Sequence, residues 1–139
     1  MTLEKLNEHR DLVLKLHRAM EMVSRLREKA EPHSPSLTGM PHGSGVGDKV
    51  ADLAIEIADL EARCDYLKAA IAEDKEVEDW IGAIPDDMIR LIFRLRFNRG
   101  MEWKVVADFV GGHNTEDNIR ALAYRYLKTC FTDATDVSP

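Results

Sequence analysis

Hydrophobic residues recur every seven positions through residues 1–30, on two adjacent lines of a helical surface. The first line holds Leu6, Val13 and Met20, the second holds Leu16 and Val23, and Leu12, Ala19 and Leu26 widen the stripe. This spacing predicts one amphipathic helix from about Leu3 to Lys29. The helix should end before Pro32, because proline disfavours a helical conformation in the residue that precedes it.

A second heptad pattern follows a proline- and glycine-rich stretch. Residues 31–47 contain three prolines and four glycines without periodicity, which predicts a connecting loop. Asp48 is a suitable N-cap for a second helix that continues toward Trp80 and Ile81. Its two hydrophobic lines consist of Val50, Ile57, Cys64 and Ile71, and of Leu53, Leu60 and Leu67.

The two predicted helices are long enough to fold against each other. At about 1.5 Å per residue each is roughly 40 to 50 Å long, so residues 1–83 are expected to form an antiparallel coiled-coil hairpin. Two helices cannot cover both edges of their own apolar stripes. We therefore expect the hairpin to self-associate, most simply as a homodimer.

Residues 84–131 have the pattern of three short helices, at about 86–97, 102–110 and 116–131. Pro85 and two following acids suit a first helical turn, Gly100 breaks the first helix, and Thr115 can cap the third. The expected inward residues are Met88, Leu91, Ile92 and Leu95, then Trp103, Val106, Ala107 and Val110, then Ile119, Leu122, Ala123, Tyr126 and Cys130. The predicted fold is all-α: a helical hairpin, a helix-turn-helix domain and a frayed tail over 132–139.

Charge is distributed unevenly along the chain. The net charge is −6, and 32% of the residues are charged. Residues 31–79 carry twelve acids and only four Lys or Arg, whereas Met88 to Phe131 hold eight cations and four acids. A modestly basic C-terminal module on an acidic support is compatible with nucleic-acid binding.

Several other classes of protein are disfavoured by the sequence. No apolar run is long enough to span a membrane, and residues 1–5 lack the apolar core of a signal peptide, so we expect a cytoplasmic protein. Cys64, Cys130 and the five histidines have no metal-ligand spacing. Gly43 to Gly47 lacks the preceding strand of a phosphate-binding loop. No catalytic constellation is found, so we expect no enzyme, no metal and no cofactor.

The C-terminal residues resemble a known family. Ile84-Pro85, Leu95-Arg96-Phe97, Gly100, Trp103, Val106-Ala107, Val110-Gly111 and Ile119-Arg120 resemble the region-four helix-turn-helix of bacterial sigma factors. They are more similar to phage and prophage proteins related to ArpU- and RinA-type transcriptional activators, in which a coiled coil precedes a sigma-like helix-turn-helix. Gly111 to Thr115 match their Gly-Gly-x-Asn-Thr turn, and Ser36 to Lys49 resemble their connector.

Helical geometry indicates which side chains would face DNA. With Ile119 and Ala123 in the core, the opposite side and its flanks carry Asp117, Asn118, Arg120, Ala121, Tyr124, Arg125 and Lys128, preceded in the turn by Asn114 and Thr115. The early positions would approach bases and the later ones phosphates. The turn is about two residues longer than in sigma factors, and Glu116 and Asp117 stand where a basic or polar helix start would favour phosphate.

The resemblance implies a phage-derived transcriptional regulator in a bacterial host. It would bind double-stranded DNA in the major groove, with host RNA polymerase as a further partner. One alternative is a structural or packaging oligomer such as a small terminase subunit, which also couples a helix-turn-helix to helical oligomerisation. Another alternative is a protein-interaction hairpin without DNA binding, which the acidic residues Glu116 and Asp117 support. The simplest alternative is a solvated polar face on an ordinary three-helix domain.

Overall fold

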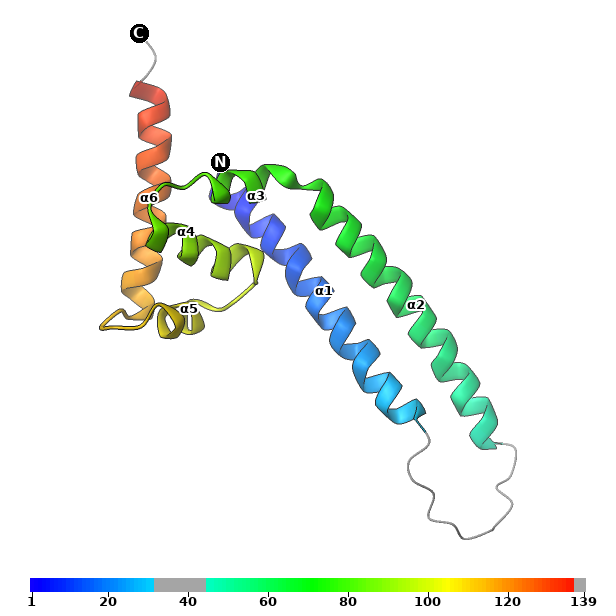
Figure 1. Ribbon diagram of the computed structural model, residues 1–139. Helices are drawn as coiled ribbons and strands as arrows, with labels where there is room; N and C mark the ends of the chain where they lie inside the picture. The colour runs from blue at the N-terminus through cyan, green and yellow to red at the C-terminus, as the bar shows by residue number, and fades with distance from the viewer. Residues whose placement is uncertain (32–44, 137–139) are drawn as a thin grey trace. The chain divides into compact units, whose positions relative to one another are not determined.

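The computed structural model describes residues 1–31 and 45–136, of which the side chains of 45–49 and 131–136 are not described. The described residues form helices and no strand, as the sequence predicted (Figure 1). They group into two compact units: unit 1 contains residues 1–14 and 70–139, and unit 2 contains residues 15–69. Unit 1 thus joins the first turns of the N-terminal helix to the C-terminal helices, a grouping absent from the predicted domains 1–83 and 84–131.

Unit 2 is a pair of helical segments with a thin core. It contains the later part of α1 (Leu3–Ala30) and most of α2 (Gly45–Glu73), which run antiparallel beside each other (Figure 1). Arg27 forms an ion pair with Glu61 across the two helices. The buried residues are Ala19, Val23, Cys64 and Leu67, and Leu16, Ile57 and Leu60 are half-buried against the first three. The predicted antiparallel packing of the heptad stripes is therefore found in this unit.

Unit 1 has a larger core that draws on every one of its helices. Besides the start of α1, it contains α3 (Lys75–Gly82), α4 (Asp87–Phe93), a π-helical turn η1 (Arg94–Asn98), α5 (Trp103–Val110) and α6 (Glu116–Asp136). The buried cluster comprises Leu6, Val77, Ile81, Ile84, Ile92, Phe93, Phe97, Trp103, Val106, Ala107, Ile119 and Ala123. Phe93 lies at its centre and contacts the rings of Trp80, Phe97 and Tyr126. These packed rings fix how α4 and α6 lie against each other.

Two features fix the chain on either side of α4 and η1. Asp86 caps α4, because its side chain accepts a hydrogen bond of 3.0 Å from the Ile89 amide. The chain then turns at Gly100, which has a φ of +74° and lies against α1. A Cβ at this position would be 3.1 Å from Cδ2 of Leu14, so the close approach of α1 also requires glycine.

The structure corrects several predicted boundaries. α2 begins at Gly45, which places Asp48 inside the first turn rather than at the N-cap. The second helix is interrupted at Asp74, whose φ and ψ are −85° and 57°. Asp74 Oδ2 lies 3.0 Å from Nδ1 of the buried His9, a contact between distant residues that heptad spacing cannot anticipate. Helix α6 extends to Asp136, five residues beyond the predicted end at Phe131; residues 137–139 lie outside the described part.

The predicted inward faces are partly wrong. Met20, Val50, Met88 and Leu91 are exposed, while Leu122, Tyr126 and Cys130 are half-buried. In α4 and η1 the buried residues are Ile92, which was predicted, and Phe93 and Phe97, which were not. A short helix shows too few turns for its apolar period to be assigned, and the core lies where the aromatic rings meet. The predicted residues Trp103, Val106, Ala107, Ile119 and Ala123 are buried.

Candidate nucleic-acid interface

The turn between α5 and α6 is held by its own polar groups. Gly111 and Gly112 have φ values of +75° and +69°, which glycine adopts without strain. Asn114 Nδ2 donates a hydrogen bond of 2.9 Å to the Gly111 carbonyl. Thr115 Oγ1 accepts one of 3.2 Å from the Asn118 amide, which confirms the predicted cap. Asn114 and Thr115 thus define the start of α6 through these contacts.

Helix α6 is anchored on one side and open on the other. Ile119 and Ala123 are each 1% exposed and fix the helix on the core. Eight of the nine predicted contact residues are exposed: Asn114, Thr115, Asp117, Asn118, Ala121, Tyr124, Arg125 and Lys128. Arg120 is half-buried. The structure therefore brings the predicted residues together on one surface, which we call the α6 face.

Two contacts within the α6 face limit how its side chains are placed. Arg120 Nη2 donates a hydrogen bond of 2.8 Å to Asp117 Oδ1, an exposed pair one turn apart. Such a pair contributes little stability and is easily exchanged for another anion. The ring of Tyr124 lies edge-on to Trp103, with 5.9 Å between the centroids. The orientation of the Tyr124 ring is therefore set by its contact with Trp103 of α5 as well as by α6 itself.

A group of arginines beside the α6 face was not among the predicted contact residues. Arg96 lies over the ring of Trp103, with Cζ 4.6 Å from the ring centroid, and donates a hydrogen bond to the Met101 carbonyl. Arg10 of α1 donates a hydrogen bond to the neighbouring Gly100 carbonyl. Burial lowers the pKa of Arg96, and the nearby charges of Arg10 and Arg120 lower it further. Sequence spacing gave no signal for Arg10, because its place depends on contacts between distant residues.

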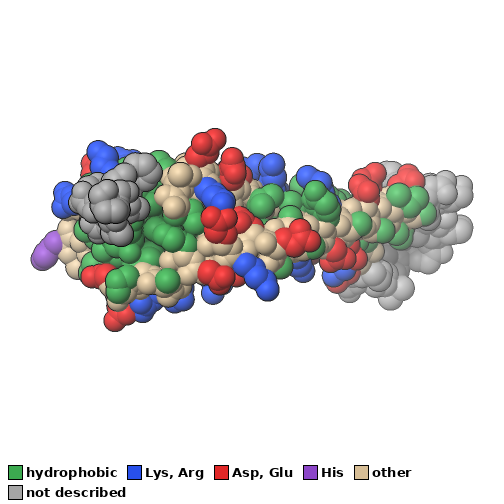
Figure 2. Space-filling model, turned by 90° about the horizontal axis from the view of Figure 1, so that it is seen from above, with side chains coloured by type: hydrophobic (Ala, Val, Ile, Leu, Met, Phe, Trp, Pro, Cys, Tyr) green, Lys and Arg blue, Asp and Glu red, His purple; other side chains and the backbone are tan. Residues whose placement is uncertain are grey.

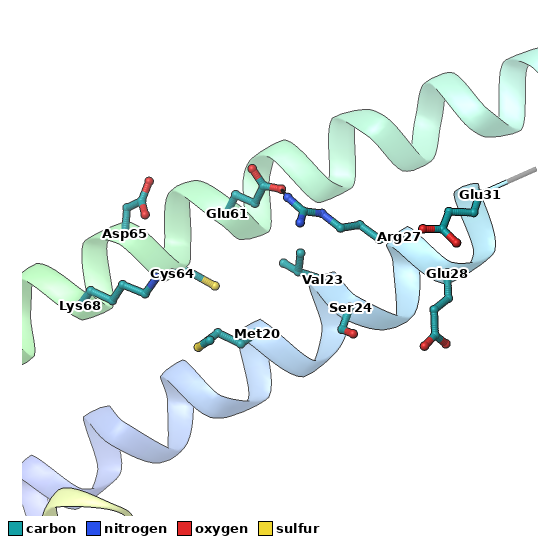
Figure 3. A pocket seen from close by; sticks show the side chains of 10 residues that line it. All are labelled: Met20, Val23, Ser24, Arg27, Glu28, Glu31, Glu61, Cys64, Asp65 and Lys68. Carbon is teal, nitrogen blue, oxygen red and sulfur yellow. Dashed lines mark hydrogen bonds and ion pairs between the residues drawn. The ribbon is translucent and has the colours of Figure 1, made fainter.

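Unit 2 contains a separate hollow of about 570 Å³ between its two helices (Figure 3). Figure 3 shows Arg27 and Glu61 turned toward each other above Val23. The charged lining consists of Arg27, Lys68, Glu28, Glu31, Glu61 and Asp65. Because both signs of charge line the hollow, its electrostatics select no class of ligand.

Comparison of the chain with protein-family models, with curated proteins and with solved structures found no match. None of the described helices is long and apolar enough to cross a membrane. Within residues 1–31 and 45–136, no three His, Cys, Asp or Glu side chains are grouped as metal ligands. Within the described residues, the α6 face is the candidate binding surface.

Proposed function

We propose that this chain is a DNA-binding transcriptional regulator that inserts α6 into the major groove of double-stranded DNA. One observation carries the proposal: the α6 face projects from a helix whose opposite side is fixed in the core by Ile119 and Ala123. A helix anchored in this way can present the same side chains to successive base edges. The resemblance to phage activators supports the same function, and no catalysis is involved.

Position along α6 assigns the roles. Near the helix start, Asn118 and Asp117 approach base edges, and Asp117 can accept a hydrogen bond from cytosine. Ala121 offers a small apolar contact. Asn114, in the turn before α6, also approaches base edges, and Thr115 caps the helix. Arg120, Tyr124, Arg125 and Lys128 approach the phosphates.

Salt titrations separate these two roles. A high-affinity duplex is first selected from random sequences with the wild-type protein, and binding to it and to unselected DNA is measured over a range of salt concentrations. Arg125→Ala should weaken binding to both duplexes and reduce the salt slope by about one ion. Asn118→Ala should reduce discrimination between them by about 1 to 3 kcal/mol and leave the slope unchanged. The function is wrong if the wild-type protein binds neither duplex at low salt.

Self-association as a homodimer is part of the proposal. Ile55 and Tyr66 in unit 2 are 66% and 63% exposed, and hydrophobic side chains lie open among charged ones on the face in Figure 2. Helical pairs commonly cover such residues with a second pair. Ile55→Asp combined with Tyr66→Asp should give a monomer by light scattering, whereas the exposed neighbour change Glu56→Gln should not. If light scattering shows that the wild-type protein is a monomer, the proposed homodimer is excluded.

The proposed setting is the cytoplasm of a bacterial host, with host RNA polymerase as a further partner. Stoichiometry distinguishes a dimeric regulator from the packaging alternative, a small terminase subunit, because a packaging ring has many subunits. A protein-interaction hairpin without DNA binding is the second candidate. It is favoured by Glu116 and Asp117, two exposed acids in the first turn of α6. Glu116→Gln should strengthen DNA binding if this acid repels phosphate, and should have no effect on a protein partner bound elsewhere.

A further inference from the structure

Arg10 and Arg96 come from distant parts of the sequence but bracket one short stretch of backbone. Arg10 Nη2 lies 3.1 Å from the Gly100 carbonyl oxygen, and Arg96 Nη1 lies 3.0 Å from the Met101 carbonyl oxygen. These carbonyls belong to consecutive residues, and the charge of Arg10 lowers the pKa of Arg96, so the two guanidinium groups lie within electrostatic range of each other. Both side chains are half-buried. Two like charges are thus held side by side at the junction between α1 and the loop before α5.

The fold supplies no carboxylate partner for either group. Among the described residues, neither Arg10 nor Arg96 forms an ion pair, and the buried Nε of each makes no hydrogen bond there. Glu102 acts on Arg96 only through its field. Each guanidinium has five N–H donors, so donors on the terminal nitrogens remain for a ligand. The carbonyl hydrogen bonds and the Trp103 ring compensate the two positive charges in part, and a bound anion would neutralise them further.

The position of the pair identifies the kind of anion. Arg96 and Tyr124 both contact Trp103, and Arg120 lies one turn before Tyr124 on α6. The arginine pair therefore lies beside the Arg120 flank of the α6 face, away from Asn118 and Arg125. A duplex with α6 in its major groove presents backbone phosphates along both flanks of that helix. Arginine pairs suit such a phosphate, since the planar fork can bind two of its oxygens.

We propose that Arg10 of α1, together with Arg96 and Arg120, holds a phosphate of the DNA backbone, so that α1 is part of the DNA-binding surface. This site rests on the proposed function. It adds α1, a helix of the hairpin expected to self-associate, to the DNA-binding surface. Arg120 exchanges the Asp117 carboxylate for the phosphate. Because both ends of that ion pair are accessible, the exchange requires no rearrangement of the core.

The test compares a variant that removes the charge with two controls. Arg10→Gln removes the positive charge and keeps a side-chain amide that can donate to the Gly100 carbonyl. Arg10→Lys keeps the charge. Arg18→Gln removes an exposed charge further along α1, in unit 2. For each protein, the affinity for a short duplex is measured over a range of salt concentrations, below the midpoint of thermal unfolding.

The salt slope of Arg10→Gln should fall by about 0.9 relative to wild type, the value for one lost phosphate contact, while Arg18→Gln and Arg10→Lys keep the wild-type slope. The proposal is overturned if Arg10→Gln and Arg18→Gln have the same slope, because Arg10 would then serve only to hold the Gly100 loop. Absence of DNA binding by the wild type is a different result, which removes the proposed function and this site with it.

Arginine Nε–H signals in NMR spectra provide a readout that a purely structural role would not move. Adding the duplex should shift the signals of Arg10 and Arg96 together. A shift at Arg125 with none at Arg10 would support DNA binding by α6 and would overturn the phosphate site. Thermal unfolding of Arg10→Gln, compared with Arg10→Lys, shows whether any change in affinity comes from a loss of folding.

Discussion

Unit 1 and unit 2 share the same two long helices but bury apolar surface in different ways. In unit 1, Leu6 of α1 joins a cluster to which α3, α4, α5 and α6 also contribute, with Phe93 among three other rings. In unit 2, Ala19, Val23, Cys64 and Leu67 are the buried residues, and Ile55 and Tyr66 are exposed. A heptad pattern on two helices produces a seam, whereas a core needs elements on several sides. Unit 1 therefore has the means to fix α6, and unit 2 has apolar surface left for a partner.

Phe93→Ala should have the largest effect, because it removes the ring at the centre of unit 1. The Phe93 side chain is 0% exposed, so its removal should lower the free energy of unfolding by about 3 to 5 kcal/mol. Phe109→Ala is the matched control, since that ring is 65% exposed and its loss should cost far less. Denaturant unfolding measures both changes. Equal losses would contradict the described core.

Gly100→Ala tests the contact between α1 and the rest of unit 1. The left-handed backbone costs about 1 to 2 kcal/mol for a residue with a Cβ, and the tight 3.1 Å contact with Leu14 should add to this. Gly112→Ala has a similar φ but no neighbour closer than 3.8 Å, so it isolates the backbone contribution. Thermal unfolding should show the larger loss for Gly100→Ala. Equal losses of stability in the two variants would contradict the close contact between Leu14 of α1 and Gly100.

Thr115→Ala should have a smaller effect, limited to the beginning of α6. Loss of an N-cap costs about 0.5 to 2 kcal/mol, and fraying of the first turn should also increase hydrogen exchange at Asn118. Thr129→Ala removes a hydroxyl that donates to the Arg125 carbonyl within the helix and serves as the control. Unchanged exchange at Asn118 in Thr115→Ala would show that the cap does not hold the α6 face.

Tyr126→Phe should have the smallest effect at neutral pH and a visible one in alkali. Burial, followed by the hydrogen bond with Cys130, raises the pKa of Tyr126 to about 12. The unfolded tyrosine ionises near pH 10, so its contribution to stability is fully present below that pH and is lost as the pH rises toward about 12. Unfolding measured across this window should fall less steeply for Tyr126→Phe than for wild type. Parallel curves would contradict the shift.

Local signals in the sequence predicted much of the fold. Heptad spacing predicted two long helices, Gly100 and the Gly111–Gly112 pair marked the turns, and Thr115 marked the cap, because each acts through its own backbone or near neighbours. Contacts between distant residues were not predicted. Asp74, where the second helix breaks, contacts His9, and Arg10 is placed by its hydrogen bond to Gly100. The spacing of residues in the sequence does not indicate either contact. The α6 face followed from helical geometry, and the arginine pair beside it did not.

The division of unit 1 between the two ends of the chain has a consequence for the order of folding during synthesis. Residues 1–14 leave the ribosome before the rest of unit 1, but Leu6 belongs to a cluster completed only by Ile119 and Ala123. At about 5 to 20 residues per second, the 55 residues of unit 2 alone delay the return of the chain to this cluster by roughly 3 to 11 seconds. Unit 2 is continuous in sequence and can pair its helices during that interval. The helices of unit 2 can therefore pair before the core of unit 1 is complete.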